Sequence, residues 1–195
     1  YLGAIDYKSS AHSFKLQDAY DGLSLQFMTY LDVIKEAFPN QKIWGALYLQ
    51  FKNQPINLSE INHLSEIAGL LKESMRYDGL VLEEAADQIK AIENIAVKKS
   101  NIYNQEEFEQ LLKLNENHYQ HAGQRLKSGQ IAINPIMKRS EGIDQTGNVR
   151  GCRYCPLKSI CRFEANVHMN EHSSEIGQKS QAEILSELKG EGRNE

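Results

Sequence analysis

The stretch Leu2-Gly3-Ala4-Ile5-Asp6-Tyr7-Lys8-Ser9-Ser10 predicts a short strand that ends in a carboxylate and an ammonium group. Because residues i and i+2 of a strand share a face, Asp6 and Lys8 point to one side and Tyr7 to the other. A carboxylate can hold a hard divalent cation, and a lysine beside it can orient a water molecule or neutralise charge on a phosphate. The pair suits metal-assisted hydrolysis of a phosphodiester. An ordinary exposed ion pair at a strand end is the alternative.

An amphipathic helix is expected next, between Gln17 and Phe38. Apolar residues recur there at three- and four-residue intervals, namely Leu23, Phe27, Tyr30, Leu31, Ile34 and Phe38. Gln26 and Tyr30 lie one turn apart on the flank of this helix and so face the same way. A strand carrying Asp-Tyr-Lys-Ser-Ser, followed by a helix carrying Gln-x-x-x-Tyr, resembles the RecB-type branch of the PD-(D/E)xK nuclease superfamily.

This resemblance implies a role for each residue of the two motifs. Asp6 would bind Mg²⁺, with the carbonyl of Tyr7 as a further ligand, and Lys8 would act on the attacking water or the scissile phosphate. Gln26 and Tyr30 would line the site beside the DNA. Nucleases of this family carry further metal ligands, a histidine and an aspartate, upstream of the Asp-x-Lys strand, whereas this sequence opens directly into that strand. We therefore interpret it as a fragment of a longer protein and expect the fragment alone to be inactive.

The fold class predicted by the remaining pattern is α/β, with a partial PD-(D/E)xK nuclease core in which a small mixed sheet is flanked by helices. Residues 42–51 predict a strand that is largely apolar on both faces and therefore interior to the sheet. One face of that strand would carry Trp44, Ala46, Tyr48 and Gln50. A turn is expected at Asp78-Gly79, and the apolar residues 80–82 after it form either a strand or the lead into a helix.

Three further helices are expected, over residues 59–71, 83–94 and 104–127. The last of them opens with Asn104 and Glu107 at the spacing of a capping box, in which each side chain satisfies a backbone N–H of the first turn. Together with the strands, these helices support the alternating α/β pattern.

The composition is that of an ordinary globular protein, with 41% hydrophobic residues, 25% charged residues and a net charge of −4. No apolar run approaches the ~20 residues of a membrane span, and the start lacks a secretory signal pattern, so we expect a cytoplasmic protein. The mild acidity argues against a protein that coats DNA generally, but it permits a local basic path over a DNA-cutting site.

All three cysteines fall within ten residues, as Cys152, Cys155 and Cys161 in a C-x2-C-x5-C pattern. In a cytoplasmic protein such clustering favours metal or iron–sulfur ligation over disulfides, with three unconnected thiols as the alternative. A structural zinc needs a fourth ligand, which His168 could supply, whereas an iron–sulfur cluster needs a fourth cysteine. Two other histidines, at 118 and 121 on an expected helix, lack acidic or cysteine partners at a suitable spacing and are interpreted as surface residues.

A nuclease domain followed by C-x2-C-x5-C resembles the nuclease domains of bacterial AddB/RexB subunits, in which one upstream and three downstream cysteines hold a 4Fe–4S cluster. The resemblance implies that Cys152, Cys155 and Cys161 are the downstream three and that the fourth cysteine lies outside this chain. It also implies two partners, DNA and an AddA/RexA-type helicase–nuclease subunit that completes a heterodimer.

Basic residues surround the cysteines, namely Arg150, Arg153, Lys158 and Arg162. They could bind DNA phosphates, or they could offset the negative charge of a thiolate-ligated cluster. The expected organisation is the back half of a nuclease domain over 1–130, a three-cysteine segment over 131–169, and a polar tail over 170–195. We expect that tail to be disordered or loosely helical, because little in it could pack.

Two functions follow. The first is a Mg²⁺-dependent DNA exonuclease domain of a helicase–nuclease subunit that acts in double-strand break repair by homologous recombination. The alternative is a non-catalytic, metal-stapled module for DNA binding or assembly, in which the nuclease motif residues are relics.

Overall fold

The computed structural model describes residues 1–10, 12–51, 67, 69, 75–91, 98, 101–138, 141–172 and 174–191. It divides into two compact units, of which the first is Tyr1–Asn117 with Leu185–Glu195 and the second is His118–Ile184. The helix expected at 59–71 lies outside the described residues, apart from the isolated positions 67 and 69. Across the described ranges, no helix is long and apolar enough to cross a membrane.

A four-stranded mixed sheet in the order β1-β2-β3-β4 forms the centre of the first unit. Strand β1 (Leu2–Lys8) is parallel to β2 (Ile43–Phe51), which is antiparallel to β3 (Met75–Leu82). The short β4 (Ile102–Tyr103) is parallel to β3. The interior position of β2 confirms the prediction made from its two apolar faces. The α/β class, with a mixed sheet flanked by helices, is also confirmed.

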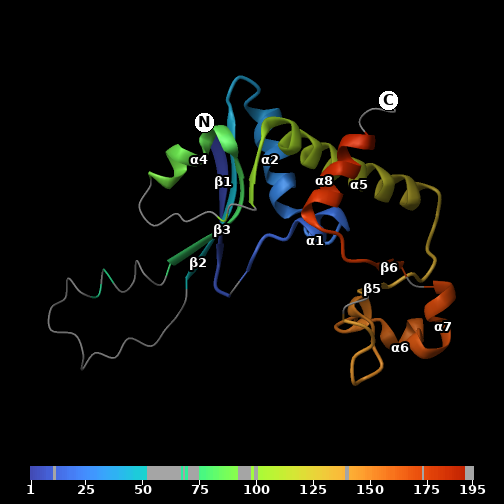
Figure 1. Ribbon diagram of the computed structural model, residues 1–195. Coiled ribbons are helices and arrows are strands. Elements are labelled where there is room, and N and C mark those ends of the chain that lie inside the picture. Colours follow the sequence, from blue (N-terminus) through green and yellow to red (C-terminus); the bar gives the residue numbers. More distant parts are fainter. Residues whose placement is uncertain are drawn as a thin grey trace. The chain divides into compact units, whose positions relative to one another are not determined.

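Helices cover both faces of this sheet (Figure 1). On one face, α2 (Gln26–Ala37) places Phe27 against the ring of Tyr48. On the other face, α4 (Glu83–Lys90) packs Ala85, Ala86 and Ile89 against Leu47 and Val81. The unit also contains α1 (Leu16–Tyr20) and the first half of α5 (Gln105–Lys127). The single helix expected between residues 17 and 38 is therefore wrong, because Gly22, with a φ of 73°, interrupts it between α1 and α2.

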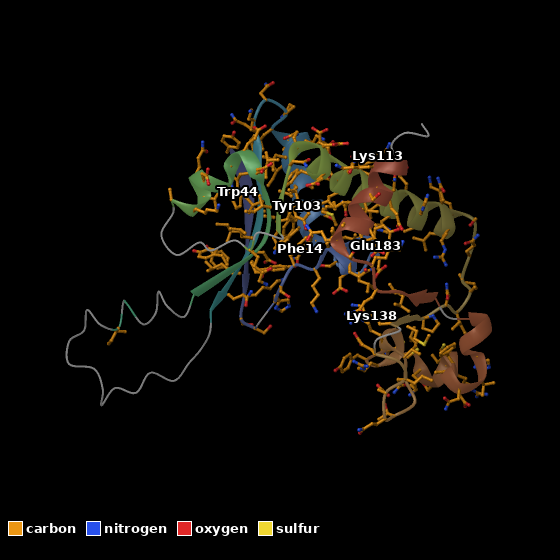
Figure 2. All side chains as sticks on the ribbon, in the orientation of Figure 1. Phe14, Trp44, Tyr103, Lys113, Lys138 and Glu183 are labelled. Carbon is orange, nitrogen blue, oxygen red and sulfur yellow. The ribbon has the colours of Figure 1, made fainter. Side chains whose placement is uncertain are left out.

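Gly45 and Gly79 let the backbones of β2 and β3 approach closely. The turn expected at Asp78-Gly79 is wrong, because this glycine serves close strand packing and not a change of chain direction. Asp78 and Gly79 both lie inside β3, where a Cβ on Gly79 would stand 2.1 Å from the carbonyl oxygen of Ala46. Gly45 has a φ of +137°, and the β1–β2 register shifts beside it. Trp44 consequently packs on the α4 side with Leu47, whereas Phe14 lies on the α2 side against Phe27 (Figure 2).

Capping boxes start both α5 and the last helix. Asn104 and Glu107 exchange the two expected hydrogen bonds, at 2.9 Å and 3.2 Å, which confirms the predicted start of α5. Ser180 and Glu183 form the same arrangement at the start of α8 (Gln181–Glu191), and Ile184 on that helix is buried. Part of the tail expected to be disordered or loosely helical over 170–195 therefore forms a helix, which a capping box and buried apolar side chains stabilise.

The second unit carries the cysteines. Its elements are β5 (Ile136–Lys138), the 3₁₀ turn η3 (Arg150–Cys152), α6 (Lys158–Cys161), α7 (Ala165–His172) and β6 (Ser174–Ile176). Strands β5 and β6 pair in parallel. A small apolar core holds the unit together, and Cys152 and Cys161 pack against its members Met137, Val149, Phe163 and Ala165.

Replacement of Gly79 by alanine tests the close approach of β2 and β3. The new Cβ would collide with backbone atoms of β2, which cannot move without breaking the sheet. We expect the Gly79→Ala chain to lose about 3 kcal/mol of unfolding free energy in urea denaturation. Gly123→Ala is the matched control, because an added Cβ meets no atom within 4 Å there. Gly123 lies in α5, so this control should gain up to about 1 kcal/mol. Equal stability of the two variants would contradict the packing described.

Candidate active site

The end of β1 presents the predicted carboxylate and ammonium together. Lys8 Nζ lies 2.7 Å from Asp6 Oδ2, and both side chains are about four-fifths buried, with exposed fractions of 21% and 19%. The close contact with the Asp6 carboxylate is the main reason why the pKa of Lys8 is raised, so this lysine is firmly protonated. Tyr7 points to the opposite side, as a strand requires, and is 67% exposed.

The first turn of α2 completes this arrangement. Lys8 Nζ donates a hydrogen bond to Gln26 Oε1 at 3.2 Å, and Gln26 Nε2 donates to the hydroxyl of Tyr30 at 2.6 Å. The i, i+4 spacing on the helix brings Gln26 and Tyr30 into contact, as predicted from the sequence. The structure thus joins Asp6 and the three other motif side chains in one continuous chain of polar contacts.

Strand β2 adds residues to the site that the sequence analysis did not assign to it. The β1–β2 register pairs Asp6 with Tyr48 and Lys8 with Gln50. The ring of Tyr48 lies beneath Lys8 Nζ, 5.2 Å from it, and the residue is 5% exposed. The alternation predicted for β2 correctly placed Tyr48 and Gln50 on one face, but its placement of Trp44 on that face is wrong, because the register irregularity beside Gly45 puts Trp44 on the face of Leu47. Which β1 residues lie beside Tyr48 and Gln50 depends on the register of the two strands, which the sequence pattern does not give.

Asp6 is the side chain of this site that could hold a divalent cation. Asp6 Oδ2 is buried and accepts no well-aligned hydrogen bond, so its 2.7 Å ion pair with Lys8 leaves lone pairs available to a cation. A carboxylate oxygen is the donor that Mg²⁺ prefers, and Mg²⁺ commonly keeps several waters. Across the described ranges, no three His, Cys, Asp or Glu side chains are grouped to hold a metal. Asp6 would therefore supply part of the coordination shell of a cation bound here, and the described residues would leave the rest of that shell to other ligands.

Asp78 anchors the segment that follows β1. It faces Tyr48 across the β2–β3 pair and is 7% exposed. Its Oδ1 accepts a hydrogen bond from the backbone N–H of Phe14 at 2.8 Å, and Lys98 Nζ lies 2.6 Å from Oδ2. Gln50, one strand over, donates its side-chain amide to the carbonyl of His12. Two buried polar side chains therefore hold residues 12–14 over the face of the sheet that carries the site.

The three cysteines lie near one another in the second unit. Burial raises the pKa of the Cys152 thiol, and the neighbouring thiols of Cys161 and Cys155 raise it further. None of the three forms a disulfide, and Cys155 is exposed while the other two are half-buried. Their spacing in sequence suits a thiophilic metal or an iron–sulfur cluster with a fourth ligand, but among the described residues the three thiols are not grouped closely enough to hold a metal by themselves.

The structure does not support His168 as that fourth ligand. Its Nδ1 lies 3.1 Å from the backbone nitrogen of Glu164, and its ring packs against Phe163. Among the described residues it forms no metal-holding group with the cysteines, and neither do His118 and His121.

Most of the basic residues around the cysteines have partners in the same segment. Arg150 pairs with Glu141, Arg153 lies 3.2 Å from Asp144, and Lys158 donates to Asn148. Asp144 also accepts the backbone N–H groups of residues 146 and 148, and its pKa falls to about 2, mainly through the hydrogen bond from residue 148. These contacts order the loop before η3. Arg162 is exposed with a φ of 55°, and no ion pair to it is found among the described residues.

Comparison with known proteins identifies the family. A family model described as the PD-(D/E)XK nuclease superfamily matches residues 1–162. The chain belongs to this superfamily. The family resemblance recognised from Asp6, Lys8, Gln26 and Tyr30 is therefore confirmed for this PD-(D/E)XK chain.

Relatives extend the comparison. The chain is 98% identical over 195 residues to an ATP-dependent helicase/deoxyribonuclease subunit of Lactococcus lactis subsp. lactis strain IL1403, and 88% identical to an exonuclease/helicase subunit, RexB, of L. lactis subsp. cremoris strain MG1363. An ATP-dependent helicase/deoxyribonuclease subunit of Streptococcus suis strain 05ZYH33 is 30% identical over 97% of the chain. The chain spans 18% of the length of each of the first two relatives and 16% of the third.

The anchoring role of Asp78 can be tested by removing its carboxylate. Asp78→Ala leaves the N–H of Phe14 without an acceptor, and we expect it to lower the unfolding free energy by about 2 kcal/mol. Asp78→Asn retains an acceptor and should lose less. On α4, Asp87 is 99% exposed, so Asp87→Ala should change stability by less than about 0.5 kcal/mol. Equal effects of Asp78→Ala and Asp87→Ala in urea denaturation would contradict the anchor.

Proposed function

We propose that this chain is the nuclease domain of an AddB/RexB-type subunit and that it cleaves DNA in a Mg²⁺-dependent reaction. The observation that carries the proposal is the continuous contact of Asp6, Lys8, Gln26 and Tyr30 at the end of β1. The names of the relatives, which are helicase/deoxyribonuclease and exonuclease/helicase subunits, support DNA as the substrate and the presence of a partner subunit. We further propose, from the family resemblance, that the partner is of the AddA/RexA type and that the complex acts as an exonuclease in double-strand break repair by homologous recombination.

Each side chain contributes a distinct property to the reaction. Asp6 holds the cation, with the carbonyl of Tyr7 proposed as a second ligand; when bound, the cation would polarise the phosphate and favour ionisation of a bound water. Lys8 is protonated, so its ammonium group donates to a phosphate oxygen or holds the attacking water, and it balances negative charge on phosphorus. Gln26 fixes the position of Lys8, and Tyr30 fixes that of Gln26.

The proposed role of the second unit is to hold a 4Fe–4S cluster and to contact DNA. Cys152, Cys155 and Cys161 would supply three ligands, and a cysteine elsewhere in the longer protein would supply the fourth. Anchoring of Cys152 and Cys161 on the small apolar core supports a fixed arrangement of the thiolates. Arg162 is the strongest candidate for a phosphate contact. The three basic residues at 150, 153 and 158 would contact DNA only by sharing or exchanging their present partners.

The nuclease assignment is tested in the intact subunit purified with its partner. Asp6→Asn and Lys8→Ala should each lower Mg²⁺-dependent degradation of end-labelled duplex DNA by about 10³-fold, because each removes a charge on which the transition state depends. ATP-driven unwinding should persist. The matched controls are Asp87→Asn and Lys90→Ala, which disrupt an exposed ion pair on α4 and should leave degradation unchanged. Wild-type degradation by the Asp6→Asn enzyme would refute the assignment and favour a non-catalytic binding module.

The cluster is tested by metal analysis of the same intact subunit, purified without oxygen. The wild type should contain iron and sulfide in equal amounts and absorb broadly in the visible range. Cys152→Ser, Cys155→Ser and Cys161→Ser should each remove the iron and lower the thermal stability, because binding of a metal group to the folded state stabilises it. Zinc in stoichiometric amount, with no iron in the wild type, would exclude the cluster.

A further inference from the structure

Tyr48 occupies the centre of the site without belonging to either motif. It lies on β2 directly opposite Asp6 on β1 and opposite Asp78 on β3, so it stands in the middle of a row that crosses three strands on one face. It is 5% exposed. A tyrosine at this depth, flanked by two carboxylates, has an environment that ordinary apolar packing does not require.

The ring of Tyr48 supports the ammonium group of Lys8. Lys8 Nζ stands over the ring at 5.2 Å from its centre, within the range in which an aromatic face attracts a cation. The centre of the Phe27 ring lies 3.9 Å from the centre of the Tyr48 ring. The Tyr48 ring is thus in contact with α2 as well as with the lysine, and this packing holds in place the aromatic face that attracts the ammonium group.

The hydroxyl of Tyr48 links the same residue to the start of α2. It lies close enough to Ser24, two residues before Gln26, for this contact to lower the pKa of Tyr48. Burial, above all, raises the pKa of Tyr48, so the phenol stays neutral at physiological pH. Tyr48 therefore contacts the lysine of β1 through its ring and the segment just before α2 through its hydroxyl.

We propose that Tyr48 is a positioning residue of the nuclease site, whose ring holds the Lys8 ammonium group in line with the scissile phosphate. This inference rests on the proposed function, since it assigns Lys8 a part in DNA cleavage. The hydroxyl contact to Ser24 keeps the ring in place, and the aromatic face is the part that acts on Lys8. An aromatic ring without a hydroxyl should therefore still hold the Lys8 ammonium group in place, whereas an aliphatic side chain should not.

The experiment compares Tyr48→Phe and Tyr48→Leu in the intact subunit with its partner, measuring kcat and KM for degradation of duplex DNA. Tyr48→Leu should lower kcat about 10- to 30-fold with little change in KM, because Lys8 acts in the transition state and not in initial binding. Tyr48→Phe should stay within about 3-fold of the wild type, since it keeps the ring. Thermal melting establishes that each variant is folded, and Tyr48→Met, another side chain without an aromatic face, replaces Tyr48→Leu if that variant does not fold.

Tyr77 provides the matched control. It lies on β3 but packs on the opposite face, in the cluster under α4. Tyr77→Leu should lower the melting temperature and leave kcat of the folded enzyme unchanged. Wild-type kcat in folded Tyr48→Leu or Tyr48→Met, or equal losses in Tyr48→Phe and Tyr48→Leu, would overturn the inference. Those results differ from failure of the proposed function, in which the wild type itself would not degrade DNA or Asp6→Asn would degrade it normally.

Discussion

The parallel pairing of β1 with β2 is the constraint on which the candidate site depends. It aligns Asp6 with Tyr48 and Lys8 with Gln50, so that the charged end of β1 faces an aromatic ring and a buried amide. A slip of one residue would turn the apolar side of β2 towards the carboxylate, because strand side chains alternate between faces. The register therefore decides whether the two charged groups of β1 meet α2 or an apolar surface.

Close backbone packing joins β2 to β3, its neighbour on the side away from β1. Gly45 and Gly79 leave no room for a side chain between β2 and β3, and Trp44 moves to the α4 face beside the irregularity at Gly45. From β3, Asp78 then reaches the backbone of Phe14 and holds the segment that leaves β1. Strands β2 and β3 thus support the site residues of β1 and also hold the segment that follows β1.

Strand alternation and helical spacing were sufficient to predict how the motif residues group, whereas the other residues of the site could be placed only from the pairing of strands. Strand alternation placed Asp6 beside Lys8, and helical spacing placed Gln26 beside Tyr30, all within short stretches of sequence. Tyr48 joined the site only through a pairing between strands about 40 residues apart, which periodicity does not encode. Asp78-Gly79 has the composition of a turn, yet the glycine is required there by its contact with Ala46. The capping box at Ser180 and Glu183 was a readable signal for α8, but the polar composition of the segment obscured it.

Measurement of Mn²⁺ binding to the intact protein tests cation binding at Asp6 most directly. Mn²⁺ accepts the same oxygen ligands as Mg²⁺, and its electron paramagnetic resonance signal distinguishes bound from unbound ions. Asp6→Asn removes the buried carboxylate while keeping the size of the side chain, and Asp87→Asn provides the exposed control. We expect Asp6→Asn to weaken Mn²⁺ binding and Asp87→Asn to leave it unchanged. Equal Mn²⁺ affinity of the wild type and Asp6→Asn would contradict a cation site at Asp6.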